Sequence, residues 1–132
     1  MVIGAGGAGL MAVAQAQRMG AFAVIVVDID AAKRESALHA GASRAIDGTA
    51  ADAVAQIQAA TGGGAWTVFN FVDSSQTASL AIAALAKGGT AVVLDLLGGS
   101  DVGGERAGDK LGRLGALARR DGKDSAGRKP AL

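Results

Sequence analysis

A short glycine-rich segment near the start of the chain constrains its fold more than any other feature. Residues 4–9 read Gly-Ala-Gly-Gly-Ala-Gly, follow the apolar residues 1–3, and precede apolar positions that recur at helical spacing until Gly20. The next apolar, β-branched run, residues 23–27, ends at Asp28. Because glycines permit a tight turn and let a helix lie close against a strand, residues 1–28 are predicted to form a strand–helix–strand unit.

The same alternation of strands and helices continues along the chain. Further strands are predicted over residues 44–47, 66–72 and 90–96. Helices are predicted over residues 31–40, over residues 50–60 with Thr49 as N-cap and with Val54 and Ile57 facing inward, and from Ser74 or Ser75 up to Gly88–Gly89. Five strands that alternate with four helices predict an α/β fold with a Rossmann-type, doubly wound parallel sheet.

The pattern changes after residue 99, so we expect a dinucleotide-binding domain over residues 1–99 and a tail over residues 100–132. The first part carries 5 Lys+Arg against 7 Asp+Glu, and the second carries 8 against 5. Glycines interrupt every candidate helix in the second part and no strand-like run stands out, which predicts a disordered, glycine- and arginine-rich tail. Its basic residues have no aromatic partners, so we predict no nucleic-acid partner.

Composition excludes several classes of protein. The chain has no cysteine and one histidine, His39, which excludes a disulfide scaffold, a thiol nucleophile and a multi-histidine metal site. No apolar run reaches the ~18 residues of a membrane span. The start of the chain lacks the basic segment of a secretory signal. We therefore expect a cytoplasmic protein with no membrane partner.

The glycine-rich segment also predicts a ligand. In a strand–helix–strand unit, Gly4 makes the turn, Gly6 admits a pyrophosphate close to the backbone, and Gly9 lets the helix pack on the strand. Asp28 is suited to accept hydrogen bonds from ribose hydroxyls and to repel a 2′-phosphate, which favours NAD over NADP. A strand-end aspartate that only helps to cap the next helix is the alternative. Lys33 and Arg34 lie either near the adenosine end or an added phosphate, or only on the solvated face of their helix.

These residues together resemble the nucleotide-binding domain of zinc-type medium-chain alcohol dehydrogenases. The resemblance covers about residues 1–99. Its motifs are residues 4–9, residues 26–30 (Val-Val-Asp-Ile-Asp) with Lys33, residues 40–42 (Ala-Gly-Ala), residues 61–65 (Thr-Gly-Gly-Gly-Ala) and residues 84–89 (Ala-Leu-Ala-Lys-Gly-Gly).

The resemblance implies hydride transfer between NAD and a small alcohol or carbonyl substrate, with a catalytic zinc in the family. It implies a pyrophosphate loop, a ribose partner at Asp28, an adenosine-side lysine at Lys33, and cofactor-lining segments after two strands. The loop comprises Gly4, Gly6, Gly7, Ala8 and Gly9, and the segments are Phe71–Val72 and Leu96–Leu97.

The chain departs from the family in ways that limit this expectation. Nothing in it corresponds to the separate domain that supplies the family's zinc ligands, the first strand is truncated, and the expected sixth strand is replaced by the tail. We therefore expect a catalytically incompetent fragment that binds no zinc, with a shifted reading frame after about Gly99. The alternative is a ligand-sensing Rossmann module, similar to the regulatory nucleotide-binding domains of potassium transport systems.

Overall fold

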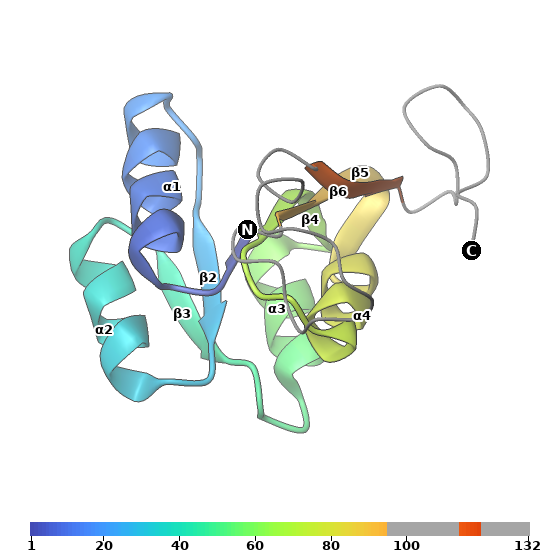
Figure 1. Ribbon diagram of the computed structural model, residues 1–132, viewed down its shortest axis with the longest axis horizontal. Helices are drawn as coiled ribbons and strands as arrows, with labels where there is room; N and C mark the ends of the chain where they lie inside the picture. Colours follow the sequence, from blue (N-terminus) through green and yellow to red (C-terminus); the bar gives the residue numbers. More distant parts are fainter. Residues whose placement is uncertain (95–113, 120–132) are drawn as a thin grey trace, which may run out of the picture.

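The computed structural model describes residues 1–94 and the backbone of residues 114–119 (Figure 1). The strands are β1 (Val2–Ile3), β2 (Ile25–Asp28), β3 (Arg44–Asp47), β4 (Ala65–Asn70), β5 (Leu85–Leu94) and β6 (Leu114–Arg119). The helices are α1 (Gly7–Arg18), α2 (Ala31–His39), α3 (Ala53–Thr61) and α4 (Ser75–Ala83). The described elements therefore alternate from β1 to β5, as the sequence predicts.

The strands form one sheet in the order β3-β2-β1-β4-β5-β6. Strands β1 to β5 are parallel, with Val2 opposite both Val26 and Phe69 in neighbouring strands. The chain winds outward from β1 in one direction and from β4 in the other, so the strand order reverses between β1 and β4. This reversal opens a crevice at the carboxyl ends of the strands, which is where doubly wound sheets bind their ligands.

The sheet carries a separate apolar core on each face. Figure 1 shows α1 and α2 together on one side and α3 and α4 together on the other. Val26 is buried with Val13 of α1, whereas its neighbour Val27 is buried with Ile57 of α3. Successive strand residues point to opposite faces, so a continuous apolar run such as β2 supplies both cores.

The prediction of an α/β fold with five parallel strands and four helices is confirmed, but two details of α3 are wrong. Asp52, not Thr49, is the N-cap residue of α3, because the Thr49 hydroxyl instead donates to Asp47 Oδ1 at 2.7 Å. Val54 is 38% exposed, since the helix begins at Ala53 and turns that residue toward the core, whereas the prediction that Ile57 faces inward is confirmed.

The glycine pair Gly88–Gly89 lies within β5 and does not end α4, which stops at Ala83. A Cβ added at Gly89 would lie 2.8 Å from the carbonyl oxygen of Ala65, and one at Gly64 would lie 2.5 Å from the backbone nitrogen of Ala86. These glycines are therefore needed where β4 and β5 approach each other closely.

The prediction that residues 100–132 contain no strand is wrong for Leu114–Arg119. This segment forms β6, which pairs antiparallel with β5 and places Leu114 opposite Leu94. A strand can pair at a sheet edge through its backbone N–H and C=O groups alone. A search for apolar side-chain patterns does not detect such a strand. The rest of the predicted tail lies outside the described residues, where its disorder stays a prediction. Across the described part of the chain, no helix has the length and apolar character needed to cross a bilayer.

Candidate functional site

The turn between β1 and α1 lies in the crevice and requires glycine at its first position. Gly4 has a φ of +92°, which side-chain-bearing residues rarely adopt, and its N–H donates to the Val27 carbonyl at 2.8 Å. A Cβ at Gly4 would lie 2.7 Å from Cγ2 of Val72, in the turn after β4. Gly4 therefore lies in close contact with both β2 and the turn after β4.

The other glycines of the turn divide into one that is packed and two that are open. A Cβ at Gly9 would lie 1.8 Å from the Gly4 carbonyl oxygen, so α1 packs directly on the turn. A Cβ at Gly6 or Gly7 would meet no atom within 4 Å. The surface above Gly6 and Gly7 is therefore bare backbone that a ligand can approach closely.

The N-terminus of α1 faces this bare surface without a side-chain cap. Its N-cap residue is Gly6, and no acidic residue lies in its first turn. The first backbone N–H groups of a helix have no partner within the helix and carry a partial positive charge. This end of α1 is consequently suited to an anion such as a phosphate.

Asp28 joins the end of β2 to the glycine turn. Its Oδ2 accepts the Ala5 N–H and its Oδ1 accepts the Asp30 N–H, both at 2.8 Å. Two backbone donors therefore fix the carboxylate at the carboxyl edge of the sheet, where it is only partly buried. Each oxygen retains a second lone pair for an incoming hydroxyl donor.

Asp47, at the end of β3, lies beside Asp28 in the sheet register. Its Oδ1 accepts from the Thr49 hydroxyl at 2.7 Å and from the Thr49 N–H at 2.8 Å. These hydrogen bonds, with a smaller contribution from the Arg34 guanidinium, lower the pKa of the Asp47 carboxyl below its usual value. Asp47 therefore carries a negative charge at neutral pH.

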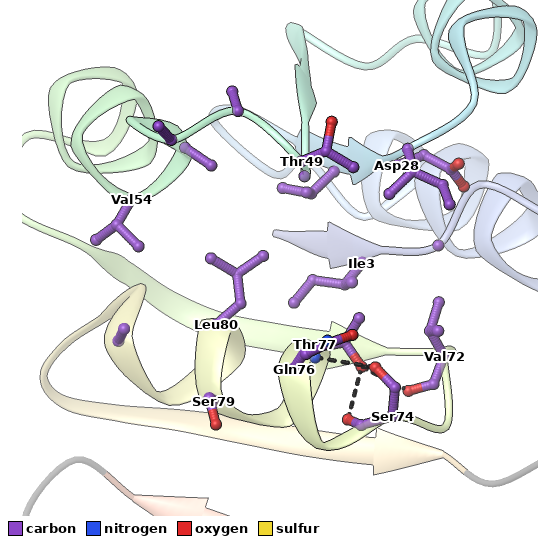
Figure 2. Close-up of a pocket in the computed structure, with 18 residues that line it drawn as sticks. Ile3, Asp28, Thr49, Val54, Val72, Ser74, Gln76, Thr77, Ser79 and Leu80 are labelled. Atoms are coloured by element: carbon purple, nitrogen blue, oxygen red, sulfur yellow. Dashed lines mark hydrogen bonds between the residues drawn. The ribbon is translucent and has the colours of Figure 1, made fainter.

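A cavity of about 660 Å³ opens beside Asp28 and extends between α3 and α4 (Figure 2). Ile3, Gly4 and Asp28 line it at the sheet, Val72 lines it at the turn after β4, and apolar residues such as Leu80 line its inner part. Its volume falls within the range of small-molecule sites. The mostly apolar walls with a carboxylate at the rim suit a flat, weakly polar group attached to a hydroxylated one.

The structure brings some of the sequence-predicted residues together. Gly4, Asp28 and Val72 line the cavity, and Phe71 lies beside Gly4. Gly6, Gly7, Ala8 and Gly9 form the end of the turn and the first turn of α1. Lys33 lies exposed in the first turn of α2 and does not line the cavity, so the structure does not join it to the site. Leu96 and Leu97 lie outside the described residues.

Sequence reasoning missed several contributors to this region. Ala5 provides the N–H that holds Asp28, and Ile29, Thr49, Ser74 and Thr77 line the cavity. Their positions in the sequence could have identified them, because these residues follow the carboxyl ends of β1, β2, β3 and β4, which meet at one edge of the sheet.

The described residues contain no group of three or more His, Cys, Asp and Glu side chains that could hold a metal ion. His39 lies exposed at the end of α2, and its Nδ1 lies 3.0 Å from the Glu35 carbonyl oxygen. The N-terminus of α1, with Gly6 as its uncapped N-cap residue, is the part of this site that suits an anionic group.

Residues 7–111 match the zinc-binding dehydrogenase family, and the chain belongs to this family. The chain is 42% identical over 96 residues to geraniol dehydrogenase of Castellaniella defragrans, covering 72% of this chain and 26% of that protein.

Solved structures of the family share the fold. Benzyl alcohol dehydrogenase of Acinetobacter calcoaceticus matches with a TM-score of 0.70 at 29% identity, over 83% of this chain and 30% of that one. An alcohol dehydrogenase zinc-binding domain protein of Burkholderia ambifaria matches with a TM-score of 0.67 at 36% identity, over 70% of this chain and 25% of that one. The chain thus spans about a quarter to a third of the length of these relatives.

Proposed function

We propose that this chain is the cofactor-binding part of an NAD-dependent, alcohol dehydrogenase-like oxidoreductase. The observation that carries the proposal is the Asp28 carboxylate, which is bonded to the Ala5 N–H of the glycine turn and lies at the rim of the cavity. This contact places an acceptor for ribose hydroxyls next to a helix N-terminus suited to a pyrophosphate. The family membership supports the same interpretation.

The residues present fit a dinucleotide. The space above Gly6 and Gly7, which a Cβ would begin to fill, leaves the backbone accessible to the pyrophosphate, and the N-terminus of α1 offers it N–H groups. The apolar walls at Ile29 and Val72 suit the adenine ring. In this arrangement the chain binds and orients the cofactor, and the bound NAD supplies the hydride acceptor or donor.

Asp28 favours NAD over NADP in this proposal. A carboxylate accepts hydrogen bonds from both adenosine ribose hydroxyls of NAD, whereas a 2′-phosphate would bring a second negative charge to the same place. The Asp28 side chain is held by Ala5 and Asp30, so it cannot easily turn away from an added phosphate.

The isolated chain is not expected to oxidise an alcohol. A catalytic zinc needs three protein ligands, drawn in alcohol dehydrogenases from Cys and His, and this chain has no Cys and one His. The residues present thus do not fit the family's metal, and the proposal assigns the chain no step that involves zinc. A measurable turnover of an alcohol by the chain alone would contradict this part of the proposal.

The proposal is tested by calorimetric titration of NAD and NADP into the chain and two variants. Gly6→Ala adds a methyl group where nothing lies within 4 Å, so the melting midpoint should stay nearly unchanged while NAD binding weakens about tenfold or more. Asp28→Ala should weaken NAD by about tenfold to a hundredfold and leave NADP little changed.

Ala55→Ser, on the exposed face of α3, is the matched control, because it adds one atom away from the site and should change neither affinity. Equal binding of NAD and NADP by the unmodified chain would remove Asp28 from the proposed role. If Gly6→Ala bound NAD as tightly as the unmodified chain, the glycine turn would have no part in NAD binding.

A further inference from the structure

The guanidinium of Arg34 lies at the carboxyl end of β2, next to the ribose position of the proposed function. Its Nη1 donates to the backbone carbonyl oxygen of Asp28 at 3.0 Å, and its Nη2 lies 3.5 Å from Oδ2 of Asp47. The Arg34 side chain is 21% exposed. It is therefore held in place between the ends of β2 and β3 and is not a freely moving surface cation.

The guanidinium of Arg34 is suited to bind a 2′-phosphate, and it lies at the end of β2, close to where the proposed function places the adenosine ribose. NADP differs from NAD by a phosphate on the 2′-oxygen of the adenosine ribose, the same ribose whose hydroxyls Asp28 would bind in NAD. Arginine binds phosphate through two parallel N–H donors. In this chain, however, one of those donors is directed at the Asp28 carbonyl oxygen and a second nitrogen lies against Asp47.

Asp47 is itself fixed. Its other oxygen, Oδ1, accepts both the Thr49 hydroxyl and the Thr49 N–H, which leaves Oδ2 for Arg34. A partly exposed ion pair of this kind contributes little to stability. Its effect on the site is larger, because it offsets the arginine charge and keeps Nη2 of the guanidinium beside Asp47.

Resting on the proposed function, we propose that Asp47 is a specificity-determining residue that acts through Arg34. By retaining the guanidinium, Asp47 withholds it from a 2′-phosphate and so reinforces the preference for NAD that Asp28 sets. Release of Arg34 from Asp47 opens the site to NADP.

Asp47→Asn is the variant that separates these contributions. An asparagine can keep Oδ1 as the acceptor for both Thr49 donors, while its NH2 group replaces the oxygen that faces Arg34. Two donors then face each other, so the guanidinium is released from Asp47, while its bond to the Asp28 carbonyl oxygen and the turn after β3 remain.

The experiment compares two probes that differ only in the 2′-phosphate: adenosine 5′-monophosphate and adenosine 2′,5′-bisphosphate. Calorimetric titrations of the whole chain should show that Asp47→Asn tightens the bisphosphate by about tenfold, the size expected for one new charge-assisted contact. The affinity for the monophosphate should change less than about twofold.

Two double variants distinguish a contact of Arg34 from a general change of charge. Adding Arg34→Ala to Asp47→Asn should abolish the gain, whereas adding Lys33→Ala, the same loss of charge at the neighbouring residue, should keep most of it. A gain that both additions reduce equally, or no gain at all, would overturn the inference while leaving the proposed function intact. If the unmodified chain bound neither NAD nor the monophosphate, both would be wrong.

Discussion

Two of the strand-to-helix turns, the first from β1 into α1 and the second from β4 into α4, differ in how the helix is capped. In the first turn the helix is capped by Gly6, with no side-chain hydrogen bond, and bare backbone faces outward. In the second turn Ser74 caps the helix by accepting the Thr77 N–H at 3.1 Å. One turn is open to a ligand, and the other is closed by its own side chains.

The second turn is held by a network that leaves few groups free. The buried Asn70 accepts the Val72 N–H at 3.0 Å and donates its amide to the Thr77 hydroxyl at 3.1 Å (Figure 2 labels Val72, Ser74 and Thr77). The Thr77 hydroxyl also lies 2.9 Å from the Val72 carbonyl oxygen. Local hydrogen bonds therefore make this turn rigid, whereas the first turn depends on Asp28 and on backbone contacts from other strands.

The largest effect is expected when the close packing of the first turn is broken. Gly9→Ala places a Cβ 1.8 Å from the Gly4 carbonyl oxygen, and two backbone segments cannot move apart without disturbing β1. We expect a loss of about 3 kcal/mol or more in the free energy of unfolding, measured by urea denaturation. Gly7→Ala, the same change where nothing lies within 4 Å, should leave the free energy of unfolding unchanged or raise it by up to about 1 kcal/mol.

A smaller effect is expected when the second turn loses its central hydroxyl. Thr77→Val keeps the shape of the side chain but leaves the Asn70 amide and the Ser74 hydroxyl without this partner. The free energy of unfolding should fall by about 1–3 kcal/mol. Thr77→Ser retains the hydroxyl and should recover most of this loss; an unchanged free energy of unfolding in Thr77→Val would show that the hydroxyl network does not stabilise the turn.

The smallest effect concerns Asp47, beside the first turn, and depends on pH. Because the Thr49 hydrogen bonds lower the pKa of this carboxyl, its ionised form stabilises the folded chain above its ordinary pKa of 3.8, and this contribution disappears as the pH falls further. The difference in melting midpoint between the unmodified chain and Asp47→Asn should therefore shrink between pH 6 and pH 3. A difference that stays constant would show that the charge of Asp47 contributes nothing.

Several parts of the fold and of the site were predictable because they depend on neighbours in sequence. Residues 44–47 were predicted as a strand and form β3, and Ser74, one of two predicted caps, is the N-cap of α4. The glycine turn followed from the order strand, glycines and helix. Lys33 lies exposed in α2 and outside the cavity, and its role at the adenosine end stays a prediction.

By itself, the sequence determined the alternation of strands and helices, the parallel sheet and the position of the glycine turn, since apolar periodicity and glycine spacing are local properties of the chain. Four features depend on tertiary contacts: the hydrogen bond from Ala5 to Asp28, the ion pair of Asp47 with Arg34, the close approach of β4 and β5 at Gly64 and Gly89, and the pairing of β6 with β5. Each of these contacts joins segments that the sequence pattern treats as independent. Their geometry exists only after the strands have paired and brought distant backbone atoms within hydrogen-bonding distance.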